Sequence, residues 1–579
     1  MIRAENLSYS FPEKDLYNKI SFTIEDGQHC AFIGTSGTGK STLVNIIMEP
    51  EEYLYDGKLE ISENCRIGYV SQFAKVDKTQ DVTVFDYLSE QFVKLQDEIN
   101  AICKEMETAT EFDELMERYQ VVLDSFNAID GDNYENNITK KLNLAELSKQ
   151  KDMLVSQLSG GEFKLIQVIK EMLTAPNLLI MDEPDVFLDF ENLNALMNLI
   201  NAHKGTLLVI THNRFLLDHC FNKIIHLENK EMQEFDGRYI DYNFSLLQMK
   251  IEKQELAAAD TEEIERNEKL VEQLRKEATI FTSATRGRAL HARVSFLERL
   301  KAKRIKEPFV EIKQPDIHFG AGEEVEDGNV LEVKDYSVSF DEILLENVSF
   351  EIGAKDKVAL IGPNGTGKTT LLRDIYKHEN DSIQIRDNTT VGFVSQLQGE
   401  MLNESNTVLD EFLEMGFPTN QSVQEHLEKF GFEEDELYQR IHALSGGEKN
   451  LLQLAKISAG TAQLLILDEP TSHLDTYSQV ALEKAMDEYD GAILMVSHDF
   501  YAIANCMDYV LLIEDKTIRR MSIRKFRKMI YANHFDKDYL EIEQKKKNTE
   551  MKIELALKKR DYESAKVLAE QLEQIIKKM

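Results

Sequence analysis

Two pairs of adjacent carboxylates are the residues of this sequence best suited to chemistry. Asp468 and Glu469 follow a short apolar run, which predicts a buried strand with both acids at its polar end. Carboxylates in such a position suit a divalent metal ion and an activated water. Asp182 and Glu183 follow a similar apolar run. The sequence therefore predicts two equivalent sites.

A Leu-Ser-Gly-Gly-Glu segment precedes each acidic pair, and the aspartate follows the first glycine by 22 residues in both copies. Ser445 and Glu448 have the spacing of a capping box, which predicts a helix that starts at Ser445. Glycines in the first turn of this helix leave backbone N–H groups open to an anion. The two copies consist of Ser159, Gly160, Gly161 and Glu162, and of Ser445, Gly446, Gly447 and Glu448.

Two further segments match G-x-x-x-x-G-K-[ST], a loop whose backbone N–H groups wrap phosphate. Each follows an apolar strand pattern and leads into a helical one. Lys40 and Lys368 supply a point charge, and the hydroxyls of Ser41 and Thr369 can ligate Mg²⁺. The expected phosphate-binding residues are Gly34, Gly37, Gly39, Lys40, Ser41 and Thr42, and Gly362, Asn364, Gly365, Gly367, Lys368, Thr369 and Thr370.

The bulk composition narrows the class of protein. A chain of 579 residues with 42% hydrophobic residues can form several cored domains. A formal charge of −36 argues against a uniformly basic nucleic-acid binder. Five scattered cysteines predict a reducing compartment without a zinc or iron–sulfur site. No signal peptide or membrane-spanning run is present, so we expect a soluble cytoplasmic protein.

Motif spacing separates a repeated core from an insertion. The distance from Asp182 to His212 is 30 residues, as is that from Asp468 to His498. The first copy, however, has 38 more residues between its Val-Ser-Gln and Ser-Gly-Gly motifs than the second. Apolar residues at helical spacing within residues 86–128 predict an antiparallel helical hairpin there. The alternative is an ordinary surface elaboration.

A second helical hairpin is expected between the copies, at residues 241–310. Residues 286–306 have a net charge of +7, and the tip includes Arg286, Arg288 and Arg293. In so acidic a chain, a basic tip indicates contact with a polyanion, although a solvated surface remains the alternative. The predicted domains are 1–240, the linker 241–310, 311–535, and a charge-balanced helical or coiled-coil extension, 536–579, whose partner the sequence does not reveal.

Together, these duplicated motifs resemble tandem ATP-binding cassettes. Two cassettes without membrane spans, with an inserted hairpin and a helical linker, resemble the ABC-F family over nearly the whole chain. The resemblance implies an α/β fold with two P-loop ABC-type ATPase domains, a helical arm in the first and a short C-terminal helical extension. It also implies a monomeric ATPase using ATP and Mg²⁺. Its partner would be the ribosome near the tRNA exit site, with the linker tip reaching rRNA and P-site tRNA.

The resemblance further assigns roles to individual residues. The cassettes would close head to tail, so that each phosphate loop meets the Ser-Gly-Gly segment of the other cassette. Glu183 and Glu469 would polarise the attacking water, and His212 and His498 would contact the γ-phosphate. The remaining residues implied are Asp182 and Asp468 for Mg²⁺ through water, Gln72 and Gln396 for sensing metal and water, and Phe11 and Phe340 for stacking on adenine.

The two copies differ after their acidic pairs. Thr471-Ser472-His473-Leu474-Asp475 follows the family form, whereas Asp185-Val186-Phe187-Leu188-Asp189 does not. Asn213 also stands where Asp499 stands in the other copy. We therefore expect the two sites to hydrolyse ATP at different rates.

Other cassette proteins fit the sequence less well. Zinc-bearing repair ATPases and the iron–sulfur recycling ATPase need cysteine clusters, and chromosome-type ATPases split one head across a long coiled coil. Within the ABC-F family, the apparent linker turn, Thr282 to Arg288, is short. Known resistance relatives often have a longer loop, so we favour a general translation factor over ribosome protection against antibiotics.

Overall fold

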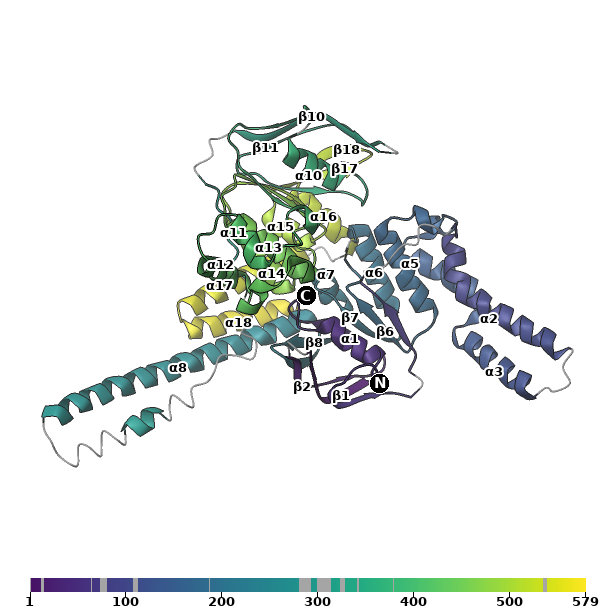
Figure 1. Ribbon diagram of the computed structural model, residues 1–579, viewed down its shortest axis with the longest axis horizontal. Helices are drawn as coiled ribbons and strands as arrows, with labels where there is room; N and C mark the ends of the chain where they lie inside the picture. The colour runs from purple at the N-terminus through teal and green to yellow at the C-terminus, as the bar shows by residue number, and fades with distance from the viewer. Residues whose placement is uncertain are drawn as a thin grey trace. The chain divides into compact units, whose positions relative to one another are not determined.

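A computed structural model describes residues 2–11, 15–63, 65–72, 81–107, 113–186, 188–280, 293–298, 314–322, 328–340, 343–378, 380–534 and 539–579 (Figure 1). These residues divide into two compact units. One contains residues 1–238 and 313–529, and therefore both cassettes. The other contains residues 239–312 and 530–579. The linker tip with Arg286 and Arg288, and also Phe187, lie outside the described residues.

The first cassette is organised around a six-stranded sheet of order β5-β6-β7-β3-β8-β9. Its strands are parallel except β9. Strands buried on both faces explain the unbroken apolar runs of the sequence. The bounds are β3 His29–Ile33, β5 Ile67–Val70, β6 Leu178–Asp182, β7 Thr206–Ile210, β8 Lys223–Glu228 and β9 Glu231–Asp236. An antiparallel sheet of order β2-β1-β4 accompanies it, with β1 Ile2–Ser10, β2 Asp15–Ile24 and β4 Asp56–Ile61.

Helices link these strands and carry the motifs. A capping box at Ser159 and Glu162 begins α5, as the spacing predicts. The helices of this cassette are α1 Lys40–Met48, α4 Tyr134–Leu144, α5 Gly160–Leu173, α6 Phe190–Ala202 and α7 Arg214–Cys220.

The second cassette repeats the architecture, which confirms the predicted fold class. Its central sheet has the order β14-β15-β16-β12-β17-β18, and its antiparallel sheet has the order β11-β10-β13. The strands are β10 Asn329–Ser339, β11 Ile343–Gly353, β12 Lys357–Ile361, β13 Ile383–Ile385, β14 Val391–Val394, β15 Leu464–Asp468, β16 Ala492–Val496, β17 Tyr509–Glu514 and β18 Thr517–Ser522. The helices are α10 Lys368–Lys377, α11 Val408–Glu414, α12 Asn420–Leu427, α13 Gly446–Ser458, α14 Thr476–Glu488, α15 Phe500–Cys506 and α16 Ile523–His534.

The insertion in the first cassette contains two helices, α2 Val84–Met106 and α3 Asp113–Ala128, which pack against each other. Figure 1 shows this arm extending away from the sheet of its cassette. Its first helix begins two residues before the predicted start, because the Thr83 side chain accepts a hydrogen bond from the backbone N–H of Asp86 and caps it.

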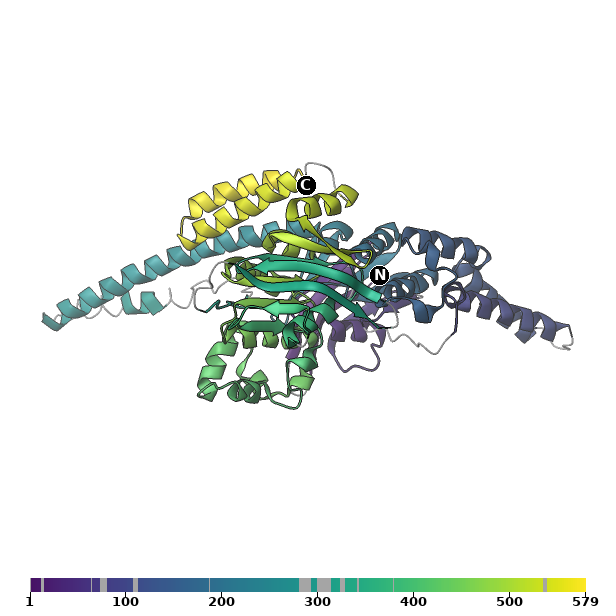
Figure 2. The same cartoon turned by 90° about the horizontal axis from the view of Figure 1, so that it is seen from above.

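The other unit contains α8 Tyr239–Ile280, α17 Tyr539–Lys558 and α18 Tyr562–Ile576. The C-terminal extension is two helices rather than one segment, because Arg560 takes a left-handed conformation between them. Figures 1 and 2 show α17 and α18 lying beside α8. Their buried residues form one core: Ile240, Ile251, Ile553, Ala556, Leu557, Ala565, Ala569, Leu572 and Ile576. The partner of the extension is therefore the linker helix.

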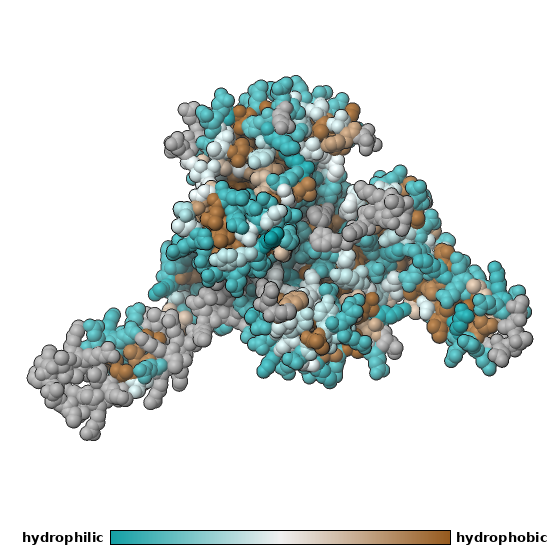
Figure 3. All heavy atoms as spheres, viewed as in Figure 1, coloured by the Kyte–Doolittle hydropathy of each residue, from teal (hydrophilic) through white to brown (hydrophobic). Residues whose placement is uncertain are grey.

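Hydrophilic residues predominate among the coloured residues on the face shown in Figure 3, in keeping with a charge of −36. Among the described residues, no helix combines the length and the apolarity that crossing a membrane requires.

Candidate functional site

Both phosphate loops have the geometry needed to hold an anion. Gly39 and Gly367 take left-handed backbone conformations and cap α1 and α10 without a side-chain hydrogen bond. The N–H groups at these helix starts therefore remain open to phosphate oxygens. Lys40 Nζ donates to the backbone oxygens of Gly34 and Thr35, both at 2.9 Å. Each loop thus holds its lysine ammonium against its own backbone.

The first acid of each pair ends a buried strand beside a phosphate-loop hydroxyl. Burial raises the pKa of Asp182, and the Ser41 hydroxyl partly offsets this effect. Burial likewise raises the pKa of Asp468 to about 6, partly offset by Thr369. Within the described residues, Oδ1 of each aspartate is buried and accepts no hydrogen bond. Unpaired carboxylate oxygens beside hydroxyls are ligands that Mg²⁺ uses, directly or through water, so these residues fit the metal.

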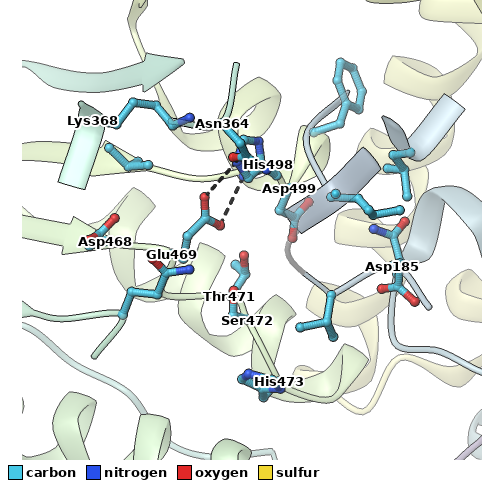
Figure 4. A pocket seen from close by; sticks show the side chains of 18 of the residues that line it. Asp185, Asn364, Lys368, Asp468, Glu469, Thr471, Ser472, His473, His498 and Asp499 are labelled. Carbon is cyan, nitrogen blue, oxygen red and sulfur yellow. Dashed lines mark hydrogen bonds and ion pairs between the residues drawn. The ribbon is translucent and has the colours of Figure 1, made fainter. Parts of the chain in front are cut away.

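The second acid of each pair is held in a strained backbone conformation. Glu183 and Glu469 have φ angles of 44° and 50°, which non-glycine residues rarely adopt. Gln72 Nε2 donates to Glu183 Oε2 at 2.5 Å. In the other cassette, the backbone N–H of His498 donates to Glu469 Oε2 at 3.2 Å, and His498 Nε2 lies 3.4 Å from Oε1 (Figure 4).

The two repeated histidines, His212 and His498, are largely buried beside these glutamates. His212 follows β7 and His498 follows β16. Burial lowers the pKa of each imidazole to about 3, so both are neutral at pH 7. His498 Nε2 also lies 3.1 Å from Asn364 Oδ1, which connects the histidine to the phosphate loop of its own cassette.

The first phosphate loop lies against the start of α13 from the other cassette. A side chain at Gly447 would come within 2.7 Å of Ser36 Oγ and 2.6 Å of the His473 backbone oxygen. A cavity of about 900 Å³ lies here, between the cassettes. It is lined by Phe11, Lys40, Ser41, Thr42, Gln72, Glu183, Gln396, Ser445, Gly446 and Gly447, among others. We call this cavity the first nucleotide site.

The second phosphate loop contacts the first cassette at Asp189, which caps α6. The backbone N–H of Asn364 donates to Asp189 Oδ2 at 3.3 Å. The cavity here has a volume of about 480 Å³ and contains Gly160, Gly161, His212, Gly365, Gly367, Lys368, Thr369, Thr370, Gln396, Asp468, Glu469 and His498 in its lining. We call it the second nucleotide site. The structure thus brings the predicted motifs together in pairs, one from each cassette.

A few predicted residues lie away from these cavities. Phe340 is 71% exposed and does not line the described part of the second site, whereas Phe11 lines the first. Four further predicted residues do not line either cavity: Gly34, Asp182, Ser159 and Gly362.

The structure also reveals contacts that motif spacing did not indicate. His473 Nδ1 lies 3.6 Å from Glu183 Oε2, so a side chain of the second cassette reaches the acidic pair of the first. Lys164 Nζ donates to the Gln72 backbone oxygen at 3.0 Å. The sequence contains one signal for the contact between His473 and Glu183. The segment around His473 differs from the corresponding segment of the first copy.

Comparisons with known proteins agree with this geometry. The family model described as ABC transporter matches residues 17–186 and 345–472. The ABC transporter ATP-binding protein YfmM of Bacillus subtilis is 30% identical over 86% of this chain and 96% of its own length. ABC transporter F family member 5 of Arabidopsis thaliana is 29% identical over 89% and 75%. The Energy-dependent translational throttle protein EttA of Escherichia coli K12 is 27% identical over 87% and 90%.

Among solved structures, a complex of archaeal ribosomal stalk protein aP1 with ribosome recycling factor aABCE1 shares the fold. Its TM-score is 0.55 at 18% identity, over 91% of this chain and 92% of that one. The tandem motifs, the paired cavities and these relatives agree, and the chain therefore belongs to the ABC transporter family, as a tandem-cassette ATPase of the ABC-F type.

Proposed function

We propose that the protein binds the ribosome near the tRNA exit site and uses ATP binding and hydrolysis to act on P-site tRNA and translation. The observation that carries this proposal is that each nucleotide site is lined by both cassettes. A nucleotide bound in such a site contacts both cassettes and stabilises their association. Hydrolysis removes the γ-phosphate contacts, so the chain can alternate between a tightly and a loosely associated form.

Each site has the groups that phosphoryl transfer to water requires. Lys40 and the start of α1 stabilise phosphate charge in the first site, while Glu183 orients and polarises the attacking water. Gln72 holds the Glu183 carboxylate in position. Mg²⁺ held near Ser41 and Asp182 would neutralise phosphate charge. Lys368, Glu469, Gln396 and His498 have the corresponding roles in the second site.

Ribosome binding is supported by the relatives and by the linker. EttA carries the name of a translational throttle protein, and the archaeal structure contains a ribosome recycling factor. The linker helix α8 is 42 residues long, and a segment with a net charge of +7 follows it. Such a segment at the end of a long helix suits a partner rich in phosphate, and ribosomal RNA and tRNA have that chemistry.

A trapped form tests the proposal as a whole. Glu183→Gln with Glu469→Gln keeps the side-chain shape and removes the charge that polarises water, so ATP should still bind while hydrolysis stops. The variant should accumulate on ribosomes and halt translation, and mapping its position should place it at the tRNA exit site. Phosphate release at the wild-type rate would contradict the catalytic assignment, and a ribosome-free variant would contradict the partner.

A second experiment tests the linker tip. Replacing Arg286, Arg288 and Arg293 by Gln should weaken ribosome binding and flatten its salt dependence. Each lost phosphate contact removes about 0.7 to 0.9 from the log–log slope. Lys250→Gln with Lys269→Gln, two exposed positions on α8 away from the tip, is the matched control. If the tip variant binds like the control at every salt concentration, the basic segment is only a solvated surface.

A further inference from the structure

Arg214 of the first cassette reaches into the second cassette. It starts α7, two residues after His212, and its guanidinium pairs with the carboxylate of Glu483 on α14. The same Nη2 atom lies 3.2 Å from Asp499 Oδ2. The side chains of Arg214 and Glu483 are only 13% and 11% exposed. A cation of one cassette is therefore enclosed by two anions of the other.

Neighbouring contacts hold this ion cluster in place from both sides. The guanidinium carbon of Arg214 lies 4.7 Å from the centre of the Tyr501 ring. The Tyr501 hydroxyl donates to Asp218 Oδ2 of α7 at 2.8 Å. Asn505 Nδ2 donates to Glu483 Oε2 at 3.0 Å. Burial disfavours the charged arginine, but the two carboxylates outweigh it and raise its pKa.

The cluster is connected directly to the second nucleotide site. Asp499 immediately follows His498, and its Oδ1 caps α15 by accepting the backbone N–H of Tyr501 at 2.9 Å. One side of the Asp499 carboxylate is thus fixed by its own helix and the other by Arg214. His498 in turn donates its backbone N–H to Glu469. Figure 4 shows Asp499 beside His498 and the two contacts of His498 to Glu469.

Among the residues that the structure describes, the first nucleotide site lacks an equivalent cluster. At the same spacing from the repeated aspartates, Phe500 stands for Arg214, Asn213 for Asp499 and Met197 for Glu483. Asn213 still caps α7, since its Oδ1 accepts the backbone N–H groups of Phe215 and Leu216 at 3.0 and 3.3 Å. Both copies thus share the helix cap, whereas the residues of the arginine–carboxylate cluster occur only beside the second site.

We propose that Arg214 is a positioning residue for the second nucleotide site, which makes hydrolysis there depend on contact with the first cassette. Without the guanidinium, two buried carboxylates lose their counter-charge. The loop that carries Asp499 then shifts toward water and takes His498 and Glu469 out of line with the γ-phosphate. Arg214 lines the second nucleotide site, but within the described residues its ion pairs are with Glu483 and Asp499 and not with the phosphate loop. The affinity for ATP should therefore change much less than the rate of hydrolysis.

The test measures each site separately in the full-length protein without ribosomes, so it does not depend on ribosome binding. Glu183→Gln leaves turnover to the second site, and Glu469→Gln leaves it to the first. Adding Arg214→Met to the first of these backgrounds should lower kcat about tenfold or more with little change in KM. Adding Arg214→Met to the Glu469→Gln background, which reports on the first site, should lower kcat less than about twofold.

Three further variants keep the result interpretable. Arg214→Lys retains the charge and should restore part of the second-site kcat, whereas Glu483→Gln should lower it and add little to Arg214→Met, since both act on one ion cluster. Arg519→Met, which breaks an exposed pair with Glu514, should change neither site. An equal loss of kcat in both backgrounds would indicate general destabilisation and overturn the proposal, as would an unchanged second-site kcat.

Discussion

Glu183 and Glu469, which we propose to be catalytic, lie in different electrostatic environments. Burial raises the pKa of Glu183, but neighbouring groups, among them a hydrogen bond from His473 and the ammonium of Lys40, outweigh it, so the net shift is downward. Burial and the charge of Asp468 raise the pKa of Glu469 instead. The pKa values of the two glutamates are thus shifted in opposite directions. This difference gives a physical basis for unequal hydrolysis rates.

A single methyl group should separate the cassettes at the first site. Gly447→Ala would place Cβ within 2.7 Å of both Ser36 Oγ and the His473 backbone oxygen, and a backbone atom cannot move aside cheaply. We expect a large loss of turnover in the Glu469→Gln background, which isolates the first site, and a smaller loss in the Glu183→Gln background. Gly460→Ala, whose nearest neighbour would be 3.9 Å away, is the control. Equal activity of the two alanine variants would show that the phosphate loop and α13 do not approach this closely.

The buried histidines predict a loss of stability in acid. Their pKa values are about 3 in the folded protein and near 6.5 when exposed. The unfolded chain therefore takes up protons that the folded chain cannot. The resulting destabilisation of the folded state is absent above pH 6.5 and grows as the pH falls toward 3. At pH 5.5, each histidine should lower the free energy of unfolding by about 1.4 kcal/mol.

Urea unfolding at pH 7.5 and 5.5 checks this prediction. His212→Gln with His498→Gln should reduce the difference between the two pH values by about 3 kcal/mol. The carboxyl groups with raised pKa values, such as Asp468, act in the opposite direction in both proteins and cancel in the comparison. An identical pH dependence in variant and wild type would show that these imidazoles titrate normally.

Among the elements, the two C-terminal helices α17 and α18 pack against the linker helix α8. These two helices and α8 share one buried core, and Lys566 of α18 pairs with Glu255 of α8 at 2.5 Å. That exposed ion pair adds little stability, so apolar packing holds the three helices together. The extension therefore determines how firmly the first part of α8 is supported.

Two substitutions on α18 test this packing. Leu572→Ala removes a side chain that is 1% exposed and should destabilise the three-helix unit by about 2–5 kcal/mol. Val567→Ala, at a position that is 55% exposed, should change it by less than about 0.5 kcal/mol. Hydrogen exchange of residues 239–259 and 539–579 is the measurement. Equal protection in both variants would mean that α18 does not pack on the linker helix.

At the scale of the whole molecule, charge and linker length favour a general translation factor. The chain is strongly acidic outside a short basic segment, so its attraction to RNA should be confined to that segment. The sequence between the two linker helices is short. We expect that expressing the protein in a drug-sensitive host leaves inhibitory concentrations of lincosamides, pleuromutilins, streptogramins and phenicols unchanged. A rise for any class that disappears in the double glutamate variant would instead indicate ribosome protection.

The sequence by itself determined the features that depend on short spacings. Phosphate loops, capping boxes and the acidic strand ends each lie within a few neighbouring residues, so their geometry follows from local backbone preferences. The repeated motifs predicted the two cassettes, and helical periodicity predicted the arm. The first arm helix begins two residues earlier than predicted, because Thr83 caps it. The linker helix begins at Tyr239, two residues before the predicted start of the linker at residue 241.

Only the tertiary structure decided which distant residues meet. His473 reaches Glu183 across 290 positions, and Arg214 reaches Glu483 across 269. No periodicity encodes such pairs, because they depend on how two folded cassettes dock. The apolar pattern of the C-terminal helices is likewise compatible with many partners. The tertiary structure shows that they pack against α8. Local motifs thus predicted the reaction, while contacts between distant segments give the two acidic pairs different surroundings.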